Sequence, residues 1–338
     1  MTANTAAALE RGPAIRGLDD GRVTLRRTLA ACGLLLVALL AAILVTSLFG
    51  SERLPMRASI CAIASLGNSF CGLTTDQYAI LLEIRLPRIF LAAAVGASLA
   101  AAGASYQALL RNPLAEPYLL GVSNGAAVGT MIALVFFGAW EWSRPLMAFI
   151  GALAATFVVY RLAHGRAGAS PERLILAGGI VTTFLSSAIV FVTTLMDATR
   201  IRSFTFWLLG DLSGSTTRLL ALAIVVAIVG TAVLAANARS LNLLMLGERD
   251  AFDLGVEVAR VRLIVFFVAS LLVGSSVASS GSVGYVGLVV PHLVRLSLGS
   301  DNRITIPAAA LAGALFVVVA DTVARTIIAP RELPVGAI

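Results

Sequence analysis

The segment from residue 85 to residue 125 contains two long apolar runs separated by Arg111, Asn112 and Pro113. Small residues recur through the first run at three- and four-residue spacings, at Gly96, Ala100, Gly103 and Ala104. Helix backbones that carry such residues can approach closely in lipid, where hydrophobicity alone gives no force that pairs helices. The segment therefore predicts two closely packed membrane helices joined by a turn.

The composition of the whole chain also favours a membrane protein. Hydrophobic residues make up 59% of the 338 residues, charged residues make up 13%, and the mean hydropathy is +0.94. A water-soluble domain could not bury that share of apolar side chains. A membrane helix needs about 20 apolar residues. We therefore expect an all-α, polytopic transmembrane bundle with spans at about 28–49, 89–110, 117–138, 145–163, 174–196, 218–236, 263–280, 286–298 and 304–328.

One of these nine segments, 286–298, is too short for a simple span. It follows Gly281 and Gly284 and contains Gly287 and Pro291. Irregular backbone inside a membrane is tolerated only where protein or a water-filled cavity covers it. The pattern predicts a half-helix that begins at a buried break, with the proline near its first turn.

The net charge of +7 and the sequence pI of about 10.1 raise the question of nucleic acid binding. The arginines are scattered among short segments between spans, whereas a nucleic acid site needs a clustered basic face, so we expect no nucleic acid partner. Positive-inside bias explains the charge better. It predicts a cytoplasmic N-terminal tail over 1–27, followed by a single transmembrane domain over 28–338. The tail carries Arg11, Arg16, Arg22, Arg26 and Arg27.

The sequence contains no lysine, so arginine supplies all 25 positive side chains. The phosphate-binding loop GxxxxGK[ST] depends on its lysine to reach the terminal phosphates. Any ATP, with its Mg²⁺, must therefore be used by a separate ATPase subunit. His164 and His292 are far apart in the sequence, and no cysteine and histidine cluster has the spacing of metal ligands. We expect no bound cofactor, no metal and no catalytic residue in this chain.

Several motifs occur in one order from about residue 30 to the last residue. They are RLPR at 85–88, Gln107, RNPLAEP at 111–117, LGVSNGA at 120–126, GSVGYVGLVVPHLVR at 281–295, ADTVAR at 320–325 and ELPVG at 332–336. This series resembles the FecCD-type permeases, which are the membrane subunits of ABC importers for iron-siderophore complexes, haem and cobalamin. The resemblance implies translocation of an iron chelate, a siderophore complex or haem, across the bacterial inner membrane by ATP-driven alternating access. Cobalamin is the alternative substrate.

The resemblance also implies partners: an ABC ATPase subunit, a periplasmic substrate-binding protein and a second permease copy, most simply in a homodimer. In such permeases ELPVG is followed by one more span of about twenty residues. We therefore expect a tenth helix after Ile338, missing from this sequence.

The longest polar interruption lies at 241–262 and predicts a short pair of helices bent at two glycines. Charged side chains, including Arg262, are expected to keep this piece in water. The resemblance implies that these are the coupling helices, which seat in a groove of the ATPase. The matching positions are Leu246, Gly247, Ala251, Leu254 and Gly255. An ordinary interfacial loop is the alternative.

Three arginines, Arg85, Arg88 and Arg325, are expected at the outer ends of spans, on a partly exposed rim. The resemblance implies that they contact acidic residues of the binding protein. Anchoring to lipid headgroups is the alternative for all three. Arg325 has a further alternative, because Asp321 lies one helical turn earlier at the spacing of an intrahelical ion pair.

The resemblance assigns two more groups of residues. Asn112, Leu114 and Ser170 match a gate at the cytoplasmic end of the pathway, although Pro171 stands where the family often has a hydroxyl residue. An Asn-Pro turn needs no such role. Thr182, Thr183, Ser186 and Ser187 match the translocation path. Hydrogen bonding between helices is the alternative for these hydroxyls.

Two observations leave questions open. Cys61 and Cys71 fall in a segment expected in the periplasm, which permits disulfides, so a bridge between them is possible.

A proton-coupled secondary transporter is the alternative from another functional class, because proton relays use carboxylates inside spans. Asp321, with Asp197 at a span end, would then be the residue to test.

Overall fold

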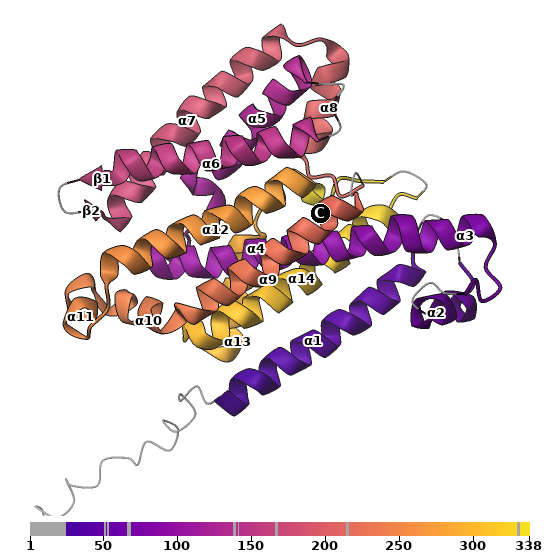
Figure 1. Cartoon of the computed structure of the whole chain (residues 1–338), viewed down its shortest axis with the longest axis horizontal. Coiled ribbons are helices and arrows are strands. Elements are labelled where there is room, and N and C mark those ends of the chain that lie inside the picture. The colour runs from indigo at the N-terminus through magenta and orange to yellow at the C-terminus, as the bar shows by residue number, and fades with distance from the viewer. Residues whose placement is uncertain are drawn as a thin grey trace, which may run out of the picture.

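A computed structural model describes residues 25–338 apart from 51, 53, 66–68, 138–139, 141, 166–167, 214–215 and 330–331. Most of the expected N-terminal tail, residues 1–24, lies outside the described residues. The described residues form a helical bundle (Figure 1). A small hairpin of β1 (His164–Gly165) and antiparallel β2 (Gly168–Ala169) connects two of its helices.

Seven helices of the described part are long and apolar enough to cross a membrane. They are α1 (Leu25–Leu48), the continuous helix that ends in α4 (Leu86–Leu109), α6 (Ser143–Ala163), α7 (Pro171–Leu195), α9 (Thr217–Ala236), α12 (Val258–Ser280) and α14 (Asn302–Thr326). Two shorter apolar helices, α5 (Val122–Phe136) and α13 (Val286–Leu298), complete the set. These nine helices correspond to the nine predicted segments, so the all-α fold is confirmed.

The helix that contains α4 differs most from its predicted bounds. The prediction began at residue 89, but the helix runs from Thr75 through α3 (Thr75–Ala79) and a π-helical stretch, η2 (Ile80–Arg85). Thr74 caps its first turn by accepting a hydrogen bond from the backbone of Gln77. Arg85 and Arg88 therefore lie well inside a helix of 35 residues and not at its end.

α4 lies at the centre of the bundle and packs against α9, α12, α13 and α14. Its glycines allow the closest approaches. A Cβ atom on Gly96 would lie 2.1 Å from the carbonyl oxygen of Gly313, and one on Gly103 would lie 1.9 Å from that of Gly287. Neither distance is possible for a real side chain. The small-residue pattern of the sequence thus becomes direct backbone contact between helices.

α13 is the half-helix expected from the sequence. It begins after a break in which Gly281 and Tyr285 both adopt positive φ angles. Pro291 is the sixth helical residue, one turn later than expected. Because proline has no N–H, it leaves the carbonyl of Gly287 without its usual helical donor. That same carbonyl faces Gly103 of α4.

The two ends of the bundle carry different elements (Figure 1). One end carries α2 (Met56–Ala64), α3 and α8 (Ala198–Leu208), and we call it the arginine end because Arg85, Arg88 and Arg325 lie near it. The opposite end carries β1, β2, α10 (Ala238–Leu246) and α11 (Glu248–Asp253), and we call it the coupling end. Two short 3-10 helices, η3 (Pro117–Leu120) and η4 (Val335–Ala337), complete the described elements.

A disulfide joins Cys61 of α2 to Cys71, with their Cα atoms 5.9 Å apart. The sequence had left this pairing open. The bridge closes a loop of ten residues at the arginine end, beside the first turns of α3. Leu54, Ala62, Leu73 and Leu81 form a small separate core beneath it.

Candidate functional site

A buried cluster of charges connects α4 to α14 at the arginine end. Arg88 donates from Nε and Nη2 to Oδ1 of Asp321, at 3.0 and 2.9 Å, and from Nη1 to Glu332 at 2.6 Å. Asp321 is fully buried, whereas the Glu332 side chain is 43% exposed. Buried charges persist only when they are paired in this way. Glu332 is therefore the accessible member of the cluster.

Arg325 completes the cluster from its position one turn after Asp321 on α14. Its Nε lies 3.0 Å from Oδ2 of Asp321, but the two atoms are not aligned for a hydrogen bond. The contact is therefore an ion pair held by charge alone, and the local pairing expected from the four-residue spacing is confirmed. Two arginines and two carboxylates together leave the cluster electrically neutral.

The third arginine of this end, Arg85, belongs to a different contact. Its guanidinium donates to the backbone carbonyls of Ser47, at the end of α1, and of Glu52. These bonds tie α1 to the central helix. Arg85 is as deeply buried as Arg325, and Arg88 is only slightly less so.

The expectation of a partly exposed arginine rim is therefore wrong for this chain. The helix extends ten residues beyond Arg85 at its N-terminal end, and Glu332 contacts Arg88 from the surface side, so neither arginine is at the surface. Burial argues equally against simple anchoring to lipid headgroups. Contact between these arginines and a binding protein stays a prediction.

The four hydroxyl residues of α7 fall on two sides of the helix. Thr183, Ser186 and Ser187 are exposed, and Thr183 and Ser187 each donate back to a carbonyl of their own helix. Thr182 and Ser186 lie toward α5, where Asn124 donates to the Thr182 carbonyl at 3.0 Å and to the Ser186 hydroxyl at 2.7 Å. The motif LGVSNGA thus supplies Asn124, which ties α5 to α7. The alternative of hydrogen bonding between helices is confirmed for Ser186, although the sequence alone did not identify its partner.

The proposed gate residues lie in turns. Asn112 accepts a hydrogen bond from the backbone N–H of Leu114 at 2.9 Å, which is the turn role expected for an Asn-Pro sequence. Leu114 itself is 72% exposed. Ser170 caps α7 by accepting from the backbone of Arg173. A role for these three residues in gating stays a prediction.

The segment at 241–262 folds as two short helices bent at glycine, as expected. Gly247, with φ of 149°, separates α10 from α11, and Gly255, with φ of 84°, follows α11. Ala251, within α11, is fully buried, while Leu246 and Leu254 are more than 60% exposed. Residues 258–262 belong to α12 instead, because that helix starts five residues before the apolar run expected at 263.

Two features of the coupling end were not found from the sequence. Phe252 is 70% exposed, and Leu246 before α11 and Leu254 after it are exposed to a similar degree, so this segment presents more apolar surface than its charged sequence suggests. Arg262 is buried and pairs with Glu248, which joins α11 to the first turn of α12. The expectation that Arg262 keeps this segment in water is wrong, because its charge is used inside the protein.

Comparison with known proteins identifies the family. The sequence model of the FecCD transport family matches residues 34–338. The chain belongs to the FecCD transport family. The match covers every described helix from the second half of α1 onward, including both ends of the bundle.

Relatives of this FecCD chain include permeases with named substrates. It is 42% identical over 267 residues to the cobalamin import system permease protein BtuC of Halobacterium salinarum, covering 79% of this chain and 72% of that protein. It is 42% identical over 263 residues to the hemin transport system permease protein HmuU of Yersinia pestis, covering 75% of this chain and 78% of that protein.

A solved structure shares the fold of this FecCD chain. It is an inward-facing ABC transporter assigned to the metal-chelate type, with a TM-score of 0.78 and 29% sequence identity, covering 92% of this chain and 94% of that one. With the family match and the apolar helices, this identifies the chain as a multi-pass membrane permease subunit of an ABC importer.

Proposed function

We propose that this FecCD permease carries an iron chelate, a siderophore complex or haem, across the bacterial inner membrane by ATP-driven alternating access. The hemin permease among its relatives supports this substrate class. Cobalamin is the second candidate, supported by the cobalamin permease of Halobacterium salinarum. Both candidate substrates are bulky metal chelates, so the translocation path must meet the same requirements of size and polarity for either one.

The observation that carries the proposal is the exposed hydroxyl face of α7. Thr183 and Ser187 present small, uncharged polar groups, and their hydroxyls are already hydrogen-bonded to their own helix. Such a surface offers no strong site that would trap a passing substrate. We infer that the α7 faces of two permease copies line the path, with the gate at Asn112, Leu114 and Ser170 at the coupling end.

The surfaces at the two ends of the bundle indicate which partner binds at each end. Exposed Leu246, Phe252 and Leu254 at the coupling end suit a groove in an ATPase, where apolar side chains would be buried. The arginine end would face the periplasm and the substrate-binding protein. The Cys61–Cys71 disulfide supports that orientation, because disulfides persist in the oxidising periplasm. The start of α1 lies toward the coupling end (Figure 1), which agrees with a cytoplasmic N-terminus.

Transport by reconstituted protein tests the proposal. The permease, its ATPase and its binding protein are assembled in proteoliposomes, and accumulation of haem, a ferric siderophore or cobalamin is measured with and without Mg-ATP. We expect ATP-dependent uptake of an iron chelate. Uptake of cobalamin alone would select the second candidate. Uptake that needs a proton gradient and no ATP would contradict the proposal.

A variant of the path separates substrate passage from assembly. Ser187→Trp places a large side chain on the exposed hydroxyl face and should reduce uptake while the ATPase still co-purifies. Phe184→Trp is the matched control, because Phe184 is also exposed on α7 but is already aromatic. Equal uptake by both variants would show that the hydroxyl face does not line the path.

A further inference from the structure

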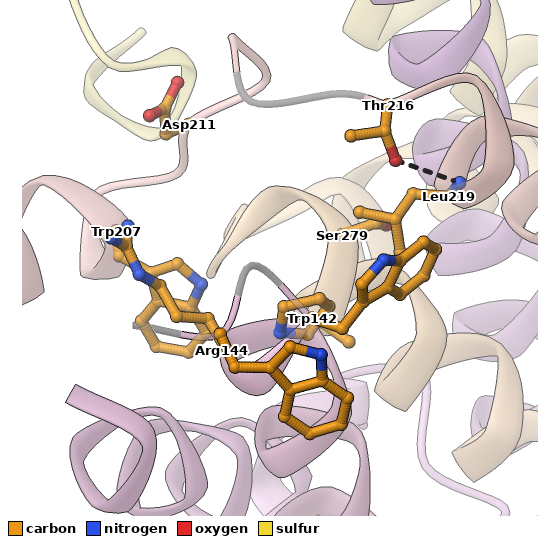
Figure 2. Close-up of a pocket in the computed structure, with 10 residues that line it drawn as sticks. Trp142, Arg144, Trp207, Asp211, Thr216, Leu219 and Ser279 are labelled. Atoms are coloured by element: carbon orange, nitrogen blue, oxygen red, sulfur yellow. Dashed lines mark hydrogen bonds between the residues drawn. The ribbon is translucent and has the colours of Figure 1, made fainter. Parts of the chain in front are cut away.

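A cavity of about 270 Å³ with a mixed polar and apolar lining lies at the arginine end, where α6 and α9 begin and α12 ends. All three tryptophans of the sequence, Trp140, Trp142 and Trp207, line it. Figure 2 shows Arg144 between Trp142 and Trp207, and Asp211 on the loop across the cavity. Tryptophans of an ordinary interfacial belt are spread around a membrane protein, whereas here they converge on one cavity.

The cavity carries one charge of each sign, and both are available to a ligand. Arg144 forms no ion pair or hydrogen bond through its side chain within the described part of the chain. Asp211 accepts from the backbone and hydroxyl of Ser213, both at Oδ1, which leaves Oδ2 open. The indole N–H groups of the three tryptophans likewise donate no hydrogen bond among the described residues.

A second cavity, apolar and about 280 Å³ in volume, continues from the first. The two share five lining residues: Trp142, Pro145, Leu219, Ala278 and Ser279. The apolar cavity then follows α6 as far as Phe149 and α9 as far as Val226. Seven residues of helix from Leu219 to Val226 correspond to about 10 Å along the axis of α9.

We propose that these joined cavities bind one phospholipid with an ethanolamine headgroup from the leaflet at the arginine end. Arg144 and the indole N–H groups suit the phosphate, since guanidinium and N–H donors bind phosphate oxygens. Asp211 and the tryptophan ring faces suit the primary ammonium group. An acyl chain then lies in the apolar cavity between α6, α9 and α12. This site is separate from the α7 face and does not depend on which substrate is transported.

These features distinguish the proposed ligand from three others. A free zwitterion would leave the apolar cavity unused, and a fatty acid would leave Asp211 facing a carboxylate of the same charge. Phosphatidylglycerol supplies the phosphate and acyl chains but has no ammonium group for Asp211. The preference for ethanolamine over glycerol headgroups is therefore the measurable signature of the site.

Tryptophan fluorescence provides a direct measurement, because every tryptophan of the chain lies in the cavity. The full-length permease is placed in vesicles that mix phosphatidylethanolamine with phosphatidylglycerol, and one of the two lipids carries brominated, quenching acyl chains. We expect brominated phosphatidylethanolamine to quench at lower mole fraction, with a selectivity of about threefold or more, the scale that a partly exposed ion pair gives. Quenching in proportion to mole fraction for both lipids would overturn the proposal.

Charge variants test the assignment of the headgroup. Asp211→Asn should abolish the preference between the two lipids, and Arg144→Ala should weaken quenching by both. Asp76→Asn and Arg218→Ala are matched controls, because both residues are exposed at the same end but neither lines the cavity. Selectivity that survives in Asp211→Asn, or that is lost equally in Asp76→Asn, would overturn the proposal.

Discussion

Arg88 and Asp321 are 233 residues apart in sequence, yet Nη2 of the arginine lies 2.9 Å from Oδ1 of the carboxylate in the interior of the bundle. The pair connects the central helix α4 to α14. The RLPR and ADTVAR motifs thus each supply one side of the same contact. Glu332 is the most exposed of the four side chains in this cluster.

We expect Asp321→Asn to destabilise the protein strongly. The change leaves Arg88 and Arg325 buried without their shared carboxylate, and breaking a buried pair in this way costs about 3–5 kcal/mol. Thermal or denaturant unfolding in detergent measures the loss. Glu332→Gln is the control, because a partly exposed pair contributes only about 0.2–1 kcal/mol.

The same Asp321→Asn variant distinguishes between the transport mechanisms. If it folds normally and keeps ATPase activity stimulated by the binding protein, but no longer transports, Asp321 would be a proton carrier. That result would favour a proton-coupled transporter. A parallel loss of folding and transport would show a structural ion pair.

Glu332→Gln should speed docking of the binding protein if Arg88 takes part in it. Reversing the charge of Arg88 would place two carboxylates together in the interior, so lost docking could not be separated from misfolding. Neutralising Glu332 instead removes the negative charge that faces Nη1 of Arg88, so the charge of the arginine is less compensated on the surface side. We expect the association rate to rise about threefold at low salt and to return to the original value at high salt, because salt screens exposed charges.

Association kinetics with the permease in nanodiscs measure this effect. Glu83→Gln is the matched control, because Glu83 is exposed at the same end and its removal changes the net charge equally, but it does not pair with Arg88. If both variants speed association to the same degree, general electrostatic steering explains the result. Arg88 would then have no specific role in docking.

Gly103→Ala should prevent close packing of α4 on α13. The new Cβ would lie 1.9 Å from the carbonyl oxygen of Gly287, so the two helices must separate. Overpacking of this kind costs about 1–3 kcal/mol, measurable as a lower melting temperature in detergent. Gly179→Ala is the control, because nothing lies within 4 Å of its added Cβ. Equal melting temperatures for the two variants would contradict the packing described here.

Gly255→Val tests the coupling helices. A valine at φ of 84° is strained by about 1–2 kcal/mol, although its Cβ meets no neighbouring atom. We expect the variant to insert into the membrane normally but to retain less ATPase during co-purification. Gly255→Asn should retain the ATPase, because asparagine tolerates this backbone conformation. If Gly255→Val retains the ATPase normally, ATPase docking at this bend would lose its support.

Much of the fold could be predicted from local patterns. Apolar runs located the nine helices because each must satisfy its own backbone hydrogen bonds in lipid, which makes a span a local property of the chain. The glycines from Gly281 to Gly287 marked the break before α13, because an interruption of a span is also a local property of the chain. The start at Thr75 was missed because α3 and η2 contain polar and charged residues that do not resemble an apolar span, although Thr74 and Gln77 form a capping box that is itself a local signal for the start of a helix.

The sequence by itself determined the membrane class, the helices and the four-residue spacing that pairs Asp321 with Arg325. Only the tertiary structure decided which charges are buried and which cavities are formed. Arg88 reaches Asp321 and Glu332 only after α4 and α14 pack together, and Trp142, Trp207 and Asp211 meet only where three helix ends converge. The physical reason is that helix formation in lipid depends on neighbours along the chain, whereas ion pairing and cavity shape depend on residues brought together from distant parts of it.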